Sequence, residues 1–137
     1  MAIPEAGKDG NMVAELGEFD LAAEIAAARS LKPWPSGIHA KTLFKKDDFR
    51  VVLISMETGA HMKEHHVDGT SSVQVLEGAI RYSTLGRTHT LHPGTLLTLA
   101  ASIPHDVEAI DQSVFLLTIS WPDTRRLAAL QHRGYGT

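Results

Sequence analysis

The chain is rich in His, a residue type whose side chain can take part in chemistry. Eight His occur among 137 residues, and six of them lie between His61 and His105. An imidazole can ligate a metal ion, move a proton or hydrogen-bond a bound molecule near neutral pH. The chain contains no Cys, which excludes thiolate metal sites, Cys nucleophiles and disulfide scaffolds. The group of six His between His61 and His105 is therefore the feature of the sequence that stands out.

Strand periodicity decides which of these side chains can meet. Residues i, i+2 and i+4 of a strand share one face, so His61, Lys63 and His65 are expected together, with His66 on the opposite face. Adjacent His65 and His66 point to the same side only where a β-bulge intervenes. His105 opens a later β-rich segment. A barrel would bring these two segments together, which places His65 and His105 in one cavity.

Short β-rich segments dominate the chain after Gly37, separated by turn residues at intervals of about 8–12 residues, and this pattern predicts a sandwich or barrel. The expected strands are 42–45, 50–55, 60–66, 73–77, 79–84, 87–92, 95–99, 105–110 and 113–120. A helix capped by Asp20 is expected before them, ended by Pro33 and Pro35. We expect a mobile arm over 1–18, a helix and connector over 19–37, a barrel over 38–121 and a helical tail over 122–137.

Two spaced motifs resemble those of the small cupins, the RmlC-like jelly-roll barrels. Gly59 and His65 stand at the first Gly and the first His of the first cupin motif, and Gly78 stands at its closing Gly. Gly94 and His105 stand at the Gly and the His of the second motif. The resemblance covers about residues 38–120. It implies an all-β cupin jelly-roll barrel, with an N-terminal helix, a short C-terminal helix and pairing as a homodimer.

The departures from the motifs bear on metal binding. The second His position of the first motif holds Val67 and its Glu position holds Ser71, so only His65 and His105 stand at the places where metal-bearing cupins hold a metal. Two His are fewer than the three protein ligands usual for Zn or Fe(II). A third ligand would have to come from His61, His66 or Glu64. The divalent metals considered are Zn, Fe, Ni and Mn.

The inner face that this register implies is mostly apolar, and it lacks the Arg and Lys cluster that a sugar nucleotide or polyphosphate would need. The expected pocket residues are His65, His105, Val67, Ser71, Val73, Val75 and Val107. An apolar pocket with a few polar groups is the usual small-molecule site. One hypothesis is therefore a cupin that binds a small, partly apolar molecule with His65 and His105 as anchors. The alternative is a metal-dependent oxygenase, isomerase or decarboxylase with a degenerate His site.

Charge and hydropathy narrow the expected partners. The formal net charge is −3, which argues against a nucleic-acid partner because such a partner requires a basic face. No apolar run approaches the ~20 residues of a membrane-spanning helix, and Met1 to Gly10 lack the layout of a signal peptide. We expect a cytoplasmic protein without a membrane partner.

Overall fold

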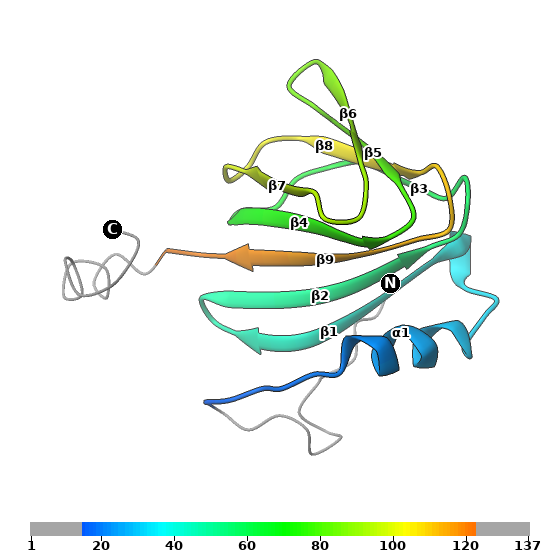
Figure 1. Ribbon diagram of the computed structural model, residues 1–137. Coiled ribbons are helices and arrows are strands. Elements are labelled where there is room, and N and C mark those ends of the chain that lie inside the picture. Colours follow the sequence, from blue (N-terminus) through cyan, green and yellow to red (C-terminus); the bar gives the residue numbers. More distant parts are fainter. Residues whose placement is uncertain (1–14, 123–137) are drawn as a thin grey trace.

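The computed structural model describes residues 15–122, which form an all-β domain preceded by one α-helix (Figure 1). Helix α1 spans Leu21–Arg29 and a 3-10 turn, η2, spans Pro35–Gly37. The strands are β1 (Ile38–Lys46), β2 (Phe49–Met56), β3 (His61–His65), β4 (Thr70–Glu77), β5 (Ile80–Thr84), β6 (Arg87–Leu91), β7 (Leu96–Leu99), β8 (His105–Ala109) and β9 (Ser113–Ser120).

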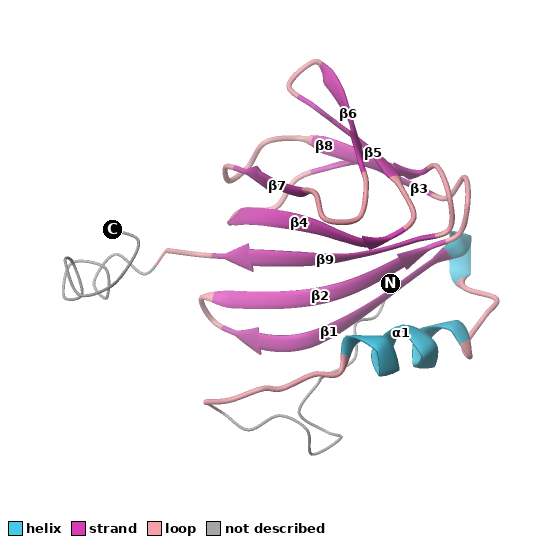
Figure 2. Cartoon of the chain, viewed as in Figure 1, coloured by secondary structure: helices cyan, strands magenta, loops and turns pink. Residues whose placement is uncertain are grey.

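The strands form two antiparallel sheets that face each other (Figure 2). The larger sheet has the order β1-β2-β9-β4-β7, and the smaller sheet has the order β3-β8-β5-β6. From β2 to β5 and again from β6 to β9, each strand lies in the other sheet from the one before it, in the manner of a jelly roll. The all-β barrel expected from the sequence is confirmed. Its first strand is longer than the expected 42–45, because Ile38 and Ala40 also face the core.

The main core lies between the sheets and is built from alternating strand residues. Val73 and Val75 of β4 face Val107 of β8 across it, and each of the three is at most 3% exposed. Phe115 is buried with them, whereas Leu116 belongs to the second cluster on the outer face of the larger sheet. The alternation in β9 therefore separates the two cores, as period two requires.

Helix α1 covers the outer face of the larger sheet. Its Ile25 packs against Leu43 and Leu53, and Asp20 caps its first turn by accepting a hydrogen bond from the backbone N–H of Ala23. The helix expected within 19–37 is confirmed, and it ends before Pro33. No helix within residues 15–122 is long and apolar enough to cross a membrane. Of the expected arm over 1–18 only residues 15–18 are described, and the helix expected over 122–137 lies outside the described residues beyond Pro122.

Candidate functional site

Two His rings meet at one end of the barrel. His65 is the last residue of β3 and His105 is the first residue of β8, and the two are direct partners in the antiparallel ladder. Their ring centroids lie 4.4 Å apart with an interplanar angle of 61°. The structure thus brings together the two His that the motifs singled out. His105 is only 6% exposed, whereas His65 is partly open to solvent.

The backbone sets the hydrogen-bonding role of each ring. The Nδ1 atom of His65 lies 2.7 Å from the carbonyl oxygen of Lys63, and Nδ1 of His105 lies 3.0 Å from that of Ile103. A carbonyl oxygen only accepts hydrogen bonds, so Nδ1 carries the proton and donates in both rings. In the neutral rings each Nε2 atom is then a hydrogen-bond acceptor. Both His therefore present the same type of group to a ligand.

Burial keeps the His105 ring neutral at physiological pH. Loss of solvation lowers the pKa of His105 below its usual value of 6.5, and the neighbouring His65 acts in the same direction. The hydrogen bond to Ile103 and the nearby Asp106 carboxylate oppose this change. Because burial has the largest effect, we expect an uncharged acceptor at Nε2.

The ring of Tyr82 packs against the His105 ring from the core side. The two rings stack at a centroid distance of 5.1 Å and an interplanar angle of 9°, and Tyr82 itself is 1% exposed. Burial raises the pKa of the Tyr82 hydroxyl to about 12. The place of Tyr82 beside the site follows from the register, because Tyr82 faces Val107 and its neighbour Thr84 faces His105.

A β-bulge in β3 overturns the expected alternation of its side chains. His61 pairs with Glu108 and Met62 with Val107, but the next pair is His65 with His105. Two β3 residues therefore stand opposite one β8 residue, and Met62 rather than His61 shares the inward face with His65. The expectation that His61 lies on the face of His65 is wrong.

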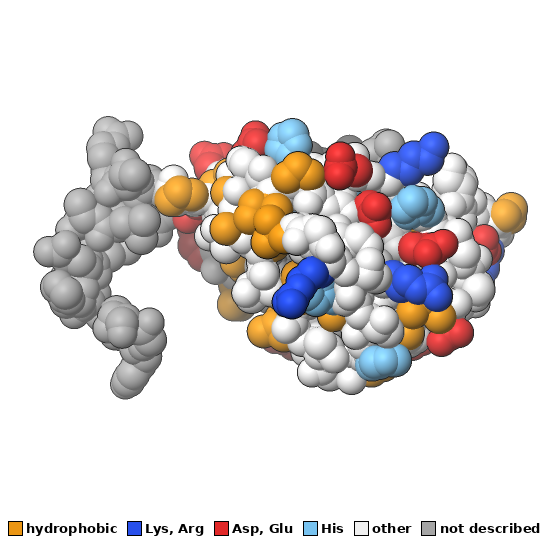
Figure 3. Space-filling model, turned by 90° about the horizontal axis from the view of Figure 1, so that it is seen from above, with side chains coloured by type: hydrophobic (Ala, Val, Ile, Leu, Met, Phe, Trp, Pro, Cys, Tyr) orange, Lys and Arg blue, Asp and Glu red, His pale blue; other side chains and the backbone are white. Residues whose placement is uncertain are grey.

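The outer face of the smaller sheet instead carries mixed charges. His61 lies there with its Nε2 atom 3.8 Å from Asp106, and Arg81 pairs with Glu108 at 3.0 Å. Seen from above, acidic, basic and His side chains are interspersed over this face (Figure 3). Exposed pairs of this kind contribute little to stability. His61 is therefore a surface residue.

The donor set does not fit a tightly held metal ion. Within residues 15–122 no three or more His, Asp or Glu side chains come close enough to share one. His66 is largely exposed and lies 3.8 Å from Asp68, and Glu64 is exposed as well. None of the three suggested third ligands joins His65 and His105. A tight Zn, Fe, Ni or Mn site of three protein ligands is thus not formed by these residues.

Most of the expected pocket residues are buried in the packed core, and only Val67 and His65 are partly exposed. Val73, Val75 and Val107 are filled core, and Ser71 is buried at 4% between Leu99 and Ile119. Val67 lies in the β3–β4 loop and its carbonyl oxygen accepts a hydrogen bond from Ser102. Apolar side chains that pack against the core yet stay partly exposed are Met62, Leu97, Ile103 and Leu117. They leave partly exposed apolar surface on the inner side of the barrel.

Comparisons with known proteins agree with this architecture. The sequence profile of the AraC-like ligand binding domain matches residues 51–133. No curated protein sequence matches the chain at a significant level. A conserved Streptococcus pyogenes protein of unknown function superposes with a TM-score of 0.66 at 20% identity, over 90% of this chain and 98% of that one.

Two further solved structures are similar. A cupin superfamily protein from Desulfitobacterium hafniense gives a TM-score of 0.64 at 16% identity, over 82% of this chain and 96% of its own. The cupin domain of an XRE family transcriptional regulator from Enterobacter cloacae gives 0.56 at 23% identity, over 64% and 99%. At such identities the likeness shows the fold alone, which is the cupin barrel.

Proposed function

The chain belongs to the AraC-like ligand binding domain family, and on that premise we propose that it binds a small, partly apolar molecule at the mouth of its barrel. His65 and His105 are its polar anchors. The observation that carries this proposal is the pair of rings at 4.4 Å, each of which donates from Nδ1 to a backbone carbonyl. Their Nε2 atoms accept hydrogen bonds from the ligand.

This geometry selects the chemistry of the bound group. Two adjacent neutral acceptors suit a ligand with hydroxyl, amide or ring N–H donors. The apolar part of the ligand packs on Met62, Leu97 and Leu117, which face inward and remain partly exposed. Tyr82 holds the His105 ring in place from the core side. A preformed, mostly apolar site with few polar groups is the usual arrangement for small-molecule recognition.

The pH dependence of binding follows from the same feature. A protonated His has no acceptor nitrogen, so binding weakens when either ring becomes charged. Because burial lowers the pKa of His105, that ring stays neutral as the pH falls toward 6.5. We expect protonation of His105 to weaken binding only at pH values below the ordinary His pKa of 6.5.

A thermal-shift screen with small molecules tests the proposal. Compounds that stabilise the wild type are re-examined on His105→Gln and, as a matched control, on His92→Gln, which changes an exposed His after β6. We expect stabilisation to be retained in His92→Gln and lost in His105→Gln. Equal stabilisation of all three proteins, or no stabilising compound, contradicts the proposal.

Metal content separates this function from the metal-dependent alternative. Protein purified without a His tag is analysed by mass spectrometry, with His65→Ala and His105→Ala beside the wild type. We expect substoichiometric metal in all three samples, because the structure supplies two donors where three are usual. About one metal ion per chain, lost in both variants, would replace the proposal by a metallocupin.

A further inference from the structure

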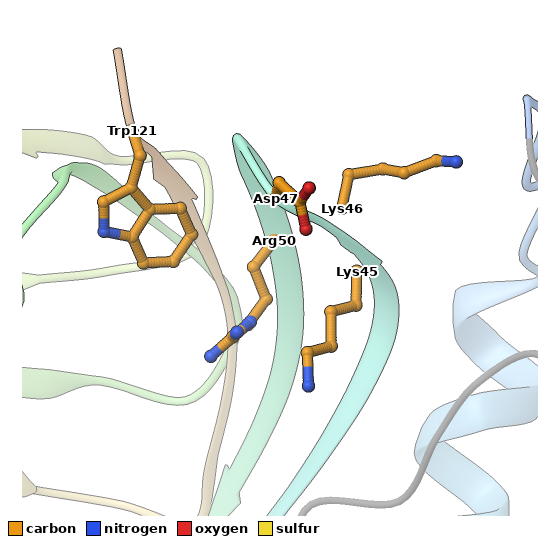
Figure 4. A pocket seen from close by; sticks show the side chains of 5 residues that line it. All are labelled: Lys45, Lys46, Asp47, Arg50 and Trp121. Carbon is orange, nitrogen blue, oxygen red and sulfur yellow. The ribbon is translucent and has the colours of Figure 1, made fainter. Parts of the chain in front are cut away.

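A basic pocket lies where the β1–β2 turn meets the end of β9 (Figure 4). Its cavity has a volume of about 620 Å³ and is open to solvent. The residues that line it are Lys45, Lys46, Asp47, Arg50 and Trp121. The lining thus combines three cationic side chains with one carboxylate and one indole. The sequence predicts an inner face without the Arg and Lys cluster that a sugar nucleotide or polyphosphate would need, and this pocket was not anticipated there.

The strand registers explain why these residues converge. Lys45 of β1 pairs with Arg50 of β2, and Arg50 pairs with Ile119 of β9, so the three side chains lie on one face of the sheet. Trp121 stands two residues after Ile119 and continues that face. Its backbone N–H donates a hydrogen bond of 2.9 Å to the carbonyl oxygen of Asp48, which fixes the indole beside the β1–β2 turn.

Arg50 is the best placed anion-binding group of the pocket. Its guanidinium carbon lies 5.3 Å from the centroid of the Trp121 ring, a cation–π arrangement that holds the side chain in one orientation. Its buried Nε atom has no hydrogen-bond acceptor within residues 15–122. Figure 4 shows Lys46 extending away from Trp121, so Lys45 and Arg50 are the cations nearest the indole. A guanidinium offers parallel N–H donors that match the two oxygens of a carboxylate.

The pocket opens at the same end of the barrel as the His pair. Ile119, the partner of Arg50, also pairs with Ser71 near the start of β4. The strand before β4 ends at His65, and only residues 66–69 connect them. Arg50 on the larger sheet and His65 on the smaller sheet therefore both lie at the same end of the barrel.

We propose that the pocket of Lys45, Arg50 and Trp121 receives the carboxylate of an organic acid, whose remaining part extends toward the His pair. The inference rests on the proposed function, since it names the class of ligand that the mouth binds. Arg50 forms the bidentate contact and Lys45 adds positive charge. Trp121 packs against the apolar part of the acid next to its carboxylate. Asp47 opposes the anion and so limits the affinity.

The test follows the indole N–H signals of the protein by NMR during titration with benzoate. The chain has two Trp, and Trp34 serves as the internal reference because its Nε1 donates to the carbonyl oxygen of Ala28 in a buried site. Benzamide is the neutral probe of the same shape, and inorganic phosphate is the competing anion. We expect benzoate to shift the Trp121 signal saturably while the Trp34 signal stays in place, and benzamide to shift neither.

Variants assign the contact to Arg50. Losing a hydrogen-bonded charge pair weakens binding about tenfold or more, so the dissociation constant for benzoate should rise by that factor in Arg50→Gln. Arg50→Lys should recover only part of it, because the planar fork is lost. The matched control Arg81→Gln, on the outer face of the smaller sheet, should leave benzoate binding unchanged. Asp47→Asn should tighten it.

Three results overturn the proposal. They are the absence of a saturable Trp121 shift, an Arg50→Gln variant that binds benzoate as the wild type does, and phosphate binding tighter than benzoate. The His105→Gln variant distinguishes a failure of the acid site from a failure of the proposed function. If the binding of screening hits requires His105 but benzoate affinity is unchanged in Arg50→Gln, only the acid site is rejected. If benzoate binding requires Arg50 but the hits still stabilise His105→Gln, the His anchors are rejected and the acid site is retained.

Discussion

The stack of Tyr82 on His105 gives the most quantitative test of how the site is built. Tyr82 is 1% exposed, so Tyr82→Ala removes a core ring, a change that costs about 3–5 kcal/mol of stability. Part of that loss belongs to the contact with His105, whose ring lies 5.1 Å away and nearly parallel. An aromatic pair of this kind contributes about 0.5–1.5 kcal/mol beyond its burial. The remainder is the cavity left among the core residues.

A double-mutant cycle isolates the pairwise contribution. The free energy of unfolding is measured in urea by circular dichroism for wild type, Tyr82→Ala, His105→Ala and the double variant. We expect a coupling energy of about 0.5–1.5 kcal/mol. Tyr82→Phe keeps the ring and should retain most of this coupling, and Tyr82→Leu replaces Tyr82→Ala if the latter does not fold. A coupling energy within about 0.3 kcal/mol of zero would show that the stack does not hold His105.

Three further predictions concern stability. Burial lowers the pKa of His105, so this residue takes up a proton more readily in the unfolded chain than in the folded one. The free energy of unfolding of the wild type should therefore exceed that of His105→Gln by its full amount above pH 6.5, and this difference should shrink as the pH falls below 6.5. Parallel pH curves for the two proteins would contradict this prediction. Both Gly59 and Gly78 have positive φ, but only at Gly78 would a new Cβ collide with the β8–β9 turn. In urea unfolding, Gly78→Ala should therefore lose at least about 2 kcal/mol more stability than Gly59→Ala. Equal losses would refute the clash. Glu24→Gln removes the negative charge from the 2.7 Å pair with Lys41, which is partly buried and joins α1 to β1. It should cost about 1–3 kcal/mol, less at high salt, and no measurable loss in urea unfolding would contradict a stabilising pair.

Much of the fold could be predicted because its signals are local. Turn residues separate the strands, and positive φ angles at Gly59, Gly78 and Gly94 explain why glycine stands at those motif positions. Spacing over the two motifs was enough to pair His65 with His105. The turns and the glycine positions depend on neighbours within a few residues, which a sequence displays directly.

The features that the sequence did not predict depend on how the strands pair in three dimensions. The bulge between Met62 and His65 inserts one residue into β3, which period-two alternation does not anticipate, and so His61 was placed on the wrong face. The pocket around Arg50 and Trp121 joins segments about 70 positions apart through the β2–β9 ladder. Contacts of that range follow from sheet order, which composition and spacing do not specify.

The most direct test of the account is the ring nitrogen spectrum of His65 and His105, recorded at pH 7.5 with and without a hit from the screen. We predict that both rings carry a proton at Nδ1 and that the ligand shifts both Nε2 resonances. A ring protonated at Nε2 in the free protein, or Nε2 resonances indifferent to a bound ligand, would contradict the central claim that the His pair anchors a small molecule at the barrel mouth.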